Sequence, residues 1–306
     1  MTQIPLSVGT LAAPEMLRAP HRERGLFVDS IIRAGIDHVF VADHISFHVG
    51  AGMDGLINAA TLTALNPALK VVVGVYLLAL RHPVTVARQL ATLAESSPGQ
   101  LVLGVGVGGE DRNEIAMCGV DPRTRGRRTD ESLQVLRQML EGDPVSHGGE
   151  FFSFERAWIQ PPPTPSIPIL IGGRASAAMR RTALYGDGWL GIWCSPQRYA
   201  DALGEIAILA AEAGRPAPAH NGIQLWIGID DDPVRARARL AKGMERFYRI
   251  PFERFEKYSP YGTPQQVAQT LARYRDAGCR LFNLMPIAAD LETGIAAVAE
   301  IKRLLG

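Results

Sequence analysis

The sequence predicts an α/β fold, a TIM (β/α)8 barrel with insertions that forms a single domain over residues 1–306. Short apolar runs rich in Val, Ile and Leu alternate with segments of helical periodicity along the whole chain. Eight strand–helix units can be counted, and a chain of 306 residues has the length of one such barrel. The alternation is interrupted at about residues 143–166 and 230–262, which we interpret as insertions.

In the first half of the chain, apolar runs predict strands at residues 4–10, 39–42, 71–76 and 101–107. Apolar spacing and end signals predict helices at residues 22–34, 55–66 and 83–96, a helical turn at 111–119, and a helix from Thr129 to Leu140. Pro83 suits the first turn of its helix, and Thr129 is predicted to cap the last helix. The clearest succession of strand, helix, strand and glycine-rich loop lies in residues 70–118.

The second half repeats this pattern after a predicted hairpin at residues 145–152. The strands are predicted at residues 167–171, 189–193, 223–229 and 281–286. The helices are predicted at residues 175–185, 197–213, 264–278 and 291–305. Thr263 and Gln266 have the spacing of a capping box at the start of the third of these helices.

Six aromatic side chains in the second insertion allow two interpretations. They form either a satellite core or a cover over the barrel mouth that shapes an apolar substrate pocket. These residues are Phe247, Tyr248, Phe252, Phe255, Tyr258 and Tyr261.

The composition excludes several classes of protein. Charged residues make up 21% of the chain and the net charge is +1, so no overall field favours nucleic acid or an acidic membrane surface. Three cysteines in so long a chain are typical of a reducing compartment. The N-terminus lacks the features of a signal peptide, and no apolar run of about 18 residues would span a membrane. We expect a cytoplasmic protein that acts on a small molecule, with no nucleic acid and no membrane as partner.

In a parallel barrel, ligands bind at the carboxyl ends of the strands. Several of these ends carry polar or glycine-rich residues, and we expect them to assemble the functional site. They are Asp43-His44, Gly74-Val75, Gly108 to Glu114, Gly172 to Arg174, Trp193-Cys194 and Asn283 to Pro286.

Four segments, in their order and spacing, resemble bacterial luciferase-like flavin or deazaflavin oxidoreductases. They are ADH at Ala42–His44, GV and RHP between Gly74 and Pro83, LGVGVGGEDRNE at Leu103–Glu114, and IPILIGG with DGW across Ile167–Trp189. The predicted hairpin and the prolines that follow it, between the last two segments, add to the resemblance. The resemblance covers nearly the whole chain and implies a luciferase-like barrel, usually dimeric, that binds FMN or the deazaflavin coenzyme F-420. Within the deazaflavin branch it resembles sugar-phosphate dehydrogenases and methylene-pterin reductases. His48 stands where some relatives carry Trp, which argues against a sugar-phosphate substrate.

The candidate catalytic residues are His44, Glu114 and Glu110. The resemblance places His44 beside the reactive ring of the cofactor, and an imidazole changes protonation near neutral pH. It also places a catalytic Glu directly after the glycine-rich loop, but an extra glycine here leaves both Glu110 and Glu114 eligible. The alternatives are an ordinary hydrogen-bonded histidine and two solvated acids at a helix start, where the helix dipole favours them.

The candidate cofactor-binding residues are glycines at the strand ends and their neighbours: Asp43, Gly74, Val75, Val107, Gly108, Gly172, Gly173 and Arg174. Glycines expose backbone N–H groups to an anionic cofactor, and the helix after Gly173 offers its N-terminus to a phosphate. Arg174 adds a charge-assisted contact. The alternatives are a plain tight turn at the glycines and a helix-capping role for Asp43. The resemblance also implies a non-proline cis peptide bond at Gly74-Val75, beneath the ring of the cofactor.

Two other kinds of site are less well supported. Gly104, Gly106 and Gly109 satisfy the dinucleotide-binding pattern G-x-G-x-x-G, but that motif belongs in the first strand–helix turn, and three such units precede it here. His44 and His48 lie four residues apart, as metal ligands can, but no third ligand at a known spacing accompanies them. We therefore predict no metal.

Together, these observations predict an oxidoreductase that transfers a hydride between coenzyme F-420 and a small organic substrate. The protein would position the cofactor, exclude water and supply a proton donor. One alternative is an FMN-dependent luciferase-like monooxygenase served by a separate reductase, and another is a flavin-binding protein without turnover. A metal-dependent barrel hydrolase is a third alternative. The resemblance also implies a homodimer.

Overall fold

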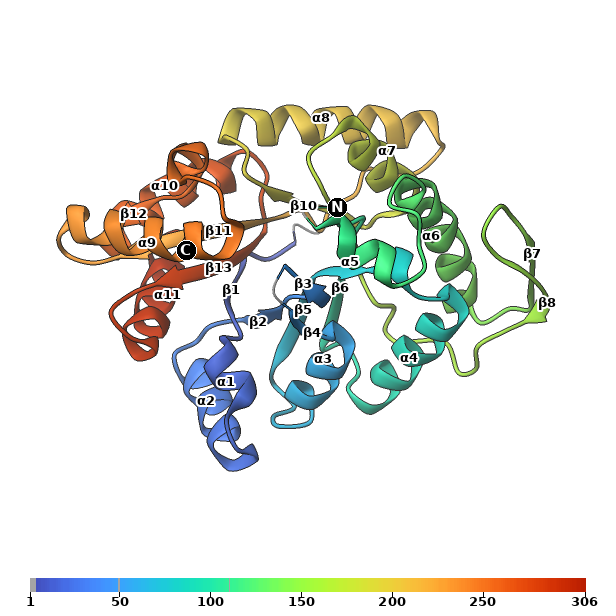
Figure 1. Cartoon of the computed structure of the whole chain (residues 1–306), viewed down its shortest axis with the longest axis horizontal. Coiled ribbons are helices and arrows are strands. Elements are labelled where there is room, and N and C mark those ends of the chain that lie inside the picture. Colours follow the sequence, from blue (N-terminus) through green and yellow to red (C-terminus); the bar gives the residue numbers. More distant parts are fainter. Residues whose placement is uncertain (1–3, 49, 110) are drawn as a thin grey trace.

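The computed structural model describes residues 4–48, 50–109 and 111–306, and its centre is a closed barrel of eight parallel strands (Figure 1). The strands follow one another around the barrel in chain order, and the pairing of β13 with β1 closes it. They are β1 (Ser7–Leu11), β2 (His38–Val41), β5 (Lys70–Leu77), β6 (Leu101–Gly106), β9 (Ile169–Gly172), β10 (Gly188–Ile192), β11 (Gly222–Ile229) and β13 (Leu281–Ile287). The predicted (β/α)8 barrel is therefore confirmed.

Helices surround the barrel, and the main hydrophobic core lies between them and the strands (Figure 1). They are α1 (Pro14–Arg18), α2 (His21–Arg33), α3 (Gly55–Thr63), α4 (Pro83–Ser96), α5 (Arg112–Met117), α6 (Arg125–Glu141), α7 (Ser176–Tyr185), α8 (Pro196–Glu212), α9 (Pro233–Tyr248), α10 (Pro264–Asp276) and α11 (Leu291–Leu305). The predicted capping box of Thr263 and Gln266 is present at the start of α10. None of the helices in the described ranges is both long and apolar enough to cross a bilayer.

The predicted N-cap at Thr129 is wrong, because α6 begins four residues earlier, at Arg125. Thr129 is fully buried, and its hydroxyl donates a hydrogen bond to the carbonyl of Arg125 at 2.7 Å, as threonines inside helices do. The additional turn is anchored by Arg128, whose Nε donates to the carbonyl of Ala79 at 2.8 Å. This contact with a distant segment extends the helix beyond the point that the local sequence signal indicates.

The two insertions have different structures. The first forms a hairpin of β7 (Val145–Gly148) and β8 (Ser153–Ala157), which protrudes from one side of the barrel (Figure 1). Its turn is tied to α6 by Glu131, which accepts hydrogen bonds from the N–H groups of Phe151 and Phe152. The second contains α9, the 3-10 turns η2 (Phe252–Arg254) and η3 (Glu256–Tyr258), and the short strand β12 (Tyr261–Gly262). Two helices, α9 and α10, therefore separate β11 from β13.

A buried polar chain joins three barrel strands. The His38 ring in β2 lies 2.9 Å from the hydroxyl of Ser7 through Nδ1 and 2.8 Å from Asn283 Oδ1 through Nε2. Gly9 leaves room for this ring, since a Cβ there would lie 2.2 Å from it. Burial lowers the pKa of His38 to about 4, so the imidazole is neutral at neutral pH.

We expect this buried histidine to make the protein acid-sensitive. Between pH 6.5 and 4 the unfolded chain binds a proton at His38 that the folded chain excludes, so stability falls as the pH falls through this range. The free energy of unfolding should fall by about 3 kcal/mol between pH 6.5 and 4, because each unit of difference between the folded and unfolded pKa corresponds to about 1.4 kcal/mol. Urea unfolding at several pH values should show a steeper decline for the wild type than for His38→Gln. Equal slopes for the two proteins would contradict this account.

Candidate active site

A small hairpin that the sequence analysis missed carries His44 at the barrel mouth, the end of the barrel formed by the carboxyl ends of its strands. It consists of β3 (His44–Phe47) and β4 (Ala51–Met53), which pair antiparallel directly after barrel strand β2. His44 therefore stands where the sequence predicted it, with its side chain partly exposed. The hairpin adds Phe47 to the same region.

His44 and Glu114, two of the predicted catalytic residues, are hydrogen-bonded to each other. Glu114 lies in α5, its side chain is 3% exposed, and its Oε2 lies 3.0 Å from His44 Nδ1. Its Oε1 accepts hydrogen bonds from the N–H groups of Ile45 and Ser46, at 2.7 and 3.1 Å. With a carboxylate at Nδ1, this nitrogen carries the proton, which leaves Nε2 for acid–base chemistry. The third candidate, Glu110, lies outside the described residues.

A second carboxylate of the α5 segment holds the far end of β3. Asp111 Oδ2 accepts the N–H of His48 at 2.8 Å, and Asp111 Oδ1 caps α5 by accepting the N–H of Asn113 at 3.0 Å. The hydrogen bond from His48 and the others around it lower the pKa of the Asp111 carboxyl. Both ends of β3 are thus fixed to α5, and this attachment orients the His44 ring.

Asp43, a predicted cofactor ligand, has both carboxylate oxygens engaged by the protein. It accepts the N–H groups of Gly55 at 3.0 Å and Leu77 at 2.8 Å, and Arg81 Nη2 lies 2.9 Å from its Oδ1. The Asp43 side chain is fully buried. These contacts tie the end of β2 to the start of α3 and the end of β5. Contact with a cofactor stays a prediction for this residue.

The Gly74-Val75 peptide in β5 is cis, at the position where the family resemblance implies such a bond. The Val75 side chain occupies space that glycines on neighbouring strands leave open. A Cβ added to Gly106 would lie 2.3 Å from Val75 Cγ2, and one added to Gly172 would lie 2.9 Å from Val75 Cγ1. Close packing therefore explains the glycines at both positions without a ligand.

The other predicted cofactor-binding residues lie in loops after β6 and β9. Val107 and Gly108 follow β6, and Gly173 and Arg174 lead into α7. Gly108 and Gly173 have positive φ values of 66° and 126°, which glycine adopts readily. Residues 174–177 are exposed, and among the described residues no side chain caps α7. The N–H groups of this helix start are available to an anion.

Two buried polar atoms near Gly74 have no hydrogen-bond partner among the described residues: Asn283 Nδ2 and Gln224 Oε1. A Cβ built on Gly74 would lie 3.2 Å from the first and 2.9 Å from the second. Both atoms lie inside the closed barrel with almost no accessible surface, so they form an unpaired polar spot in the barrel interior and not an open part of the mouth.

Four aromatic side chains, which we name the aromatic wall, form a row at the barrel mouth: Phe47, Trp226, Phe247 and Tyr248. Phe47 of β3 and Phe247 of α9 stack with their ring centroids 5.5 Å apart, and Phe247 contacts Trp226 at 5.8 Å. Trp226 Nε1 donates a hydrogen bond to Tyr248 Oη at 3.1 Å. The His44 ring lies 4.3 Å from the Phe47 ring, so the wall begins beside a candidate catalytic residue.

Each interpretation of the second insertion holds for part of its aromatic residues. Phe252 and Phe255 are buried with Leu240 and Met244 of α9 in a second hydrophobic cluster, which continues into the barrel strands through Phe40, Val72, Trp226 and Met285. Phe247, by contrast, is 41% exposed and belongs to the aromatic wall. The insertion therefore shares a small second core with the barrel strands and also borders the barrel mouth.

The sequence analysis missed four residues of this region, Arg81, Gln224, Phe47 and Trp226, although the first two carry a signal. Gln224 is a polar side chain inside an apolar strand, and Arg81 belongs to the RHP motif without having been given a role. Phe47 carries no comparable signal, because only the fold brings it to Phe247. Asn283 was expected at a strand end, but its buried amide, whose Nδ2 has no partner among the described residues, was not foreseen.

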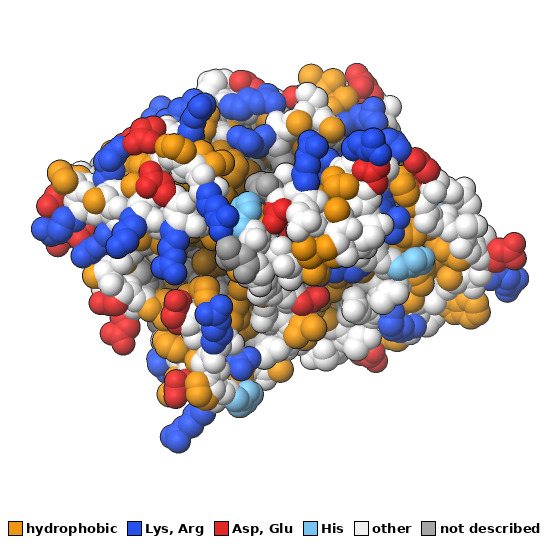
Figure 2. Space-filling model, viewed as in Figure 1, with side chains coloured by type: hydrophobic (Ala, Val, Ile, Leu, Met, Phe, Trp, Pro, Cys, Tyr) orange, Lys and Arg blue, Asp and Glu red, His pale blue; other side chains and the backbone are white. Residues whose placement is uncertain are grey.

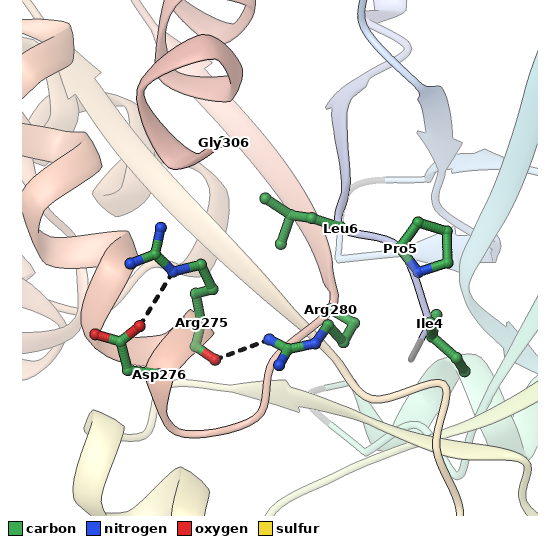
Figure 3. A pocket seen from close by; sticks show the side chains of 7 residues that line it. All are labelled: Ile4, Pro5, Leu6, Arg275, Asp276, Arg280 and Gly306. Carbon is green, nitrogen blue, oxygen red and sulfur yellow. Dashed lines mark hydrogen bonds and ion pairs between the residues drawn. The ribbon is translucent and has the colours of Figure 1, made fainter. Parts of the chain in front are cut away.

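A separate hollow of about 400 Å³ lies at the opposite end of the barrel (Figure 3). It is lined by Ile4, Pro5, Leu6, Arg275, Asp276, Arg280 and Gly306. The arginines are already engaged, since Arg280 donates to the carbonyl of Arg275 at 2.9 Å and Arg275 pairs with Asp276 at 3.1 Å. Residues at this end of a barrel serve stability, so we assign no site to the hollow.

Comparison with known proteins places these features in context. Residues 19–259 match the family model described as luciferase-like monooxygenase. An uncharacterized protein of Mycobacterium tuberculosis is 32% identical over 166 residues, which are 54% of this chain and 57% of that protein. The chain therefore spans little more than half the length of this relative. An F-420-dependent glucose-6-phosphate dehydrogenase of Kineococcus radiotolerans is 27% identical over 247 residues, covering 76% of this chain and 71% of that enzyme.

Among solved structures, an F-420-dependent secondary alcohol dehydrogenase in complex with an F-420–acetone adduct matches with a TM-score of 0.85. The match covers 99% of this chain and 100% of that one at 19% sequence identity. At this level of identity, the similarity establishes the shared barrel fold over the full length of both chains.

Proposed function

The chain belongs to the luciferase-like monooxygenase family, and from this premise we propose that it is an oxidoreductase that transfers a hydride between coenzyme F-420 and a small organic substrate. The observation that carries the proposal is the hydrogen bond between His44 and the buried Glu114 at the barrel mouth. The F-420-dependent relatives support the choice of cofactor. We also propose that the protein acts as a homodimer, which sedimentation of the purified chain would test.

The residues at the barrel mouth fit a deazaflavin cofactor. Its phosphate suits the exposed, uncapped start of α7 after Gly173, with Arg174 beside it. When bound, such a cofactor supplies the hydride-transfer chemistry, and the protein supplies orientation and proton handling.

His44 is the acid–base group in this proposal. Glu114 holds the proton at His44 Nδ1 and fixes the plane of the ring, so His44 Nε2 exchanges a proton with the substrate oxygen. Phe47 packs against the His44 ring and helps to exclude water from it. The acid–base role thus belongs to His44, and Glu114 acts by positioning it.

Binding measurements test the cofactor. Titration of the protein with coenzyme F-420 and, separately, with FMN should quench tryptophan fluorescence, with the lower Kd for F-420. A clearly lower Kd for FMN would replace the proposal by an FMN-dependent oxygenase that needs a separate reductase. Binding of F-420 without oxidation of its reduced form by any member of a carbonyl panel would favour a carrier protein.

Gly173→Val should weaken F-420 binding about tenfold or more, because a side chain would stand where the backbone meets the phosphate. The φ of 126° and a Cβ only 2.9 Å from that of Ala178 also make this substitution strained. Gly214→Val is the matched control, since Gly214 has a φ of 68° and no atoms near its added Cβ. If both folded variants bind F-420 as the wild type does, the loop at Gly173 is not part of the site.

A further inference from the structure

Trp193 stands directly after β10 in a conformation that a bulky side chain rarely adopts. Its φ is 47°, in the left-handed region, and such a conformation persists only where the surroundings enforce it. Its ring packs against Tyr248 and Phe255 of the second insertion, with centroid distances of 4.9 and 4.8 Å. The acid–base machinery at His44 makes no use of this residue.

The guanidinium of Arg174 lies over the ring of Trp193. Because β9 and β10 pair directly, the segments that follow them lie side by side at the barrel mouth. Arg174 Cζ is 5.0 Å from the centre of the Trp193 ring, within the range of a cation–π contact. Among the described residues, this guanidinium has neither an ion pair nor a hydrogen bond. The ring therefore holds the charge in place without occupying any of its N–H donors.

The indole N–H of Trp193 contributes nothing that explains a tryptophan here. Trp193 Nε1 is buried and has no partner in the described part of the chain, whereas Trp189 Nε1 donates to the carbonyl of Gly173 at 2.8 Å. An unpaired buried N–H is a cost that leucine or phenylalanine would avoid. The face of an indole is, however, the best aromatic surface for a cation. The contact with Arg174 therefore accounts for a tryptophan at this position.

We propose that Trp193 is a positioning residue, which holds the Arg174 guanidinium beside the start of α7 so that its free N–H donors bind the cofactor phosphate. The inference deepens the proposed function and rests on its phosphate site. Basic and acidic side chains are interspersed over the surface in Figure 2, and the net charge is +1, so no broad field draws a phosphate to this loop. Binding of the phosphate thus depends on individually placed groups. Trp189 fixes the carbonyl of Gly173, and Trp193 fixes the cation that follows it.

Trp193→Leu tests this assignment by binding alone. The probes are the hydroxy-deazariboflavin core of F-420 with its phosphate and the same core without it, and calorimetry on the purified protein gives their Kd values. We expect the variant to bind the phosphate-bearing probe about tenfold more weakly, with the Kd of the phosphate-free probe unchanged. Trp193→Phe keeps an aromatic face and should lose less. If the leucine variant does not fold, Trp193→Met carries the same expectation, because its flexible side chain refills the space.

Arg174→Gln completes a double-mutant cycle. Alone, it should weaken binding of the phosphate-bearing probe at least as much as Trp193→Leu does. Adding Trp193→Leu to it should change nothing further, because no cation remains for the ring to hold. Trp158→Leu is the matched control, since Trp158 is 51% exposed and takes part in none of the described ring contacts. It should leave both Kd values unchanged.

Two results would overturn the inference: equal weakening of both probes by Trp193→Leu, or the full loss from Trp193→Leu in the Arg174→Gln background. Either result gives Trp193 a purely structural role. Failure of the proposed function looks different, because the wild type then binds FMN in place of F-420. FMN and riboflavin replace the two probes in that case, and the same variants decide the role of Trp193. If the phosphate tightens the binding of neither ring to the wild type, the inference fails.

Discussion

His44→Ala is expected to lower the rate of hydride transfer by about 10²–10⁴-fold while the protein stays folded, because a positioned acid–base group contributes on this order. The His44 side chain is 22% exposed, and Glu114 keeps its hydrogen bonds to the N–H groups of Ile45 and Ser46 when the imidazole is removed. The hairpin therefore remains attached to α5. Stopped-flow reduction of bound coenzyme F-420, measured beside a thermal melt of the same preparation, checks both parts of the expectation.

His48→Asn serves as the control on the same hairpin. His48 is exposed and has a φ of 48°, a conformation that asparagine tolerates. Its variant should transfer hydride at nearly the wild-type rate. The acid–base assignment fails if His44→Ala stays within about threefold of the wild type, well short of the usual acid–base contribution. A lowered melting temperature with normal turnover would instead give His44 a structural role.

Arg81→Leu is expected to lower the free energy of unfolding by about 3–5 kcal/mol, the usual cost of leaving a buried charge without its partner. The Asp43 side chain is fully buried, and Arg81 contacts both of its oxygens. In the variant, the carboxylate keeps only the N–H groups of Gly55 and Leu77. Urea unfolding followed by circular dichroism measures the loss.

Two further variants identify the cause of that loss. Asp43→Asn combined with Arg81→Leu should recover part of the stability, because no uncompensated charge then remains buried. Arg127→Leu breaks the exposed pair with Glu150, whose side chains are 63% and 53% exposed, and should cost at most about 1 kcal/mol. If Arg81→Leu costs no more than Arg127→Leu, the network around Asp43 does not stabilise the barrel mouth.

The barrel was predictable because its signals are local. The apolar run at Val71 to Tyr76 and the capping box at Thr263 report their own conformation within a few residues. The error at Thr129 has the opposite origin, since Arg128 extends α6 through a hydrogen bond to Ala79, 49 positions away. No pattern within the helix itself records such a contact.

The candidate site was predictable in its location but not in its pairings. The segments at the carboxyl ends of the strands were expected to lie close together. His44 and Glu114, which are 70 positions apart in the sequence, are indeed hydrogen-bonded to each other. Their hydrogen bond depends on the position of α5 after the glycine-rich loop. The local sequence pattern does not predict that position. The β3–β4 hairpin was missed because its strands are four and three residues long, too short for a clear alternation.

Val75 makes positions on three strands interdependent. Its methyl groups fill the space in which side chains at positions 106 and 172 would stand, so alanine at either position requires a smaller residue at 75. A smaller residue at 75 beside the present Gly106 and Gly172 would leave a void. Substitutions at these positions are therefore epistatic: a change that is harmless in one background is damaging in another. Descendants of this sequence can alter this part of the barrel only by coordinated replacements.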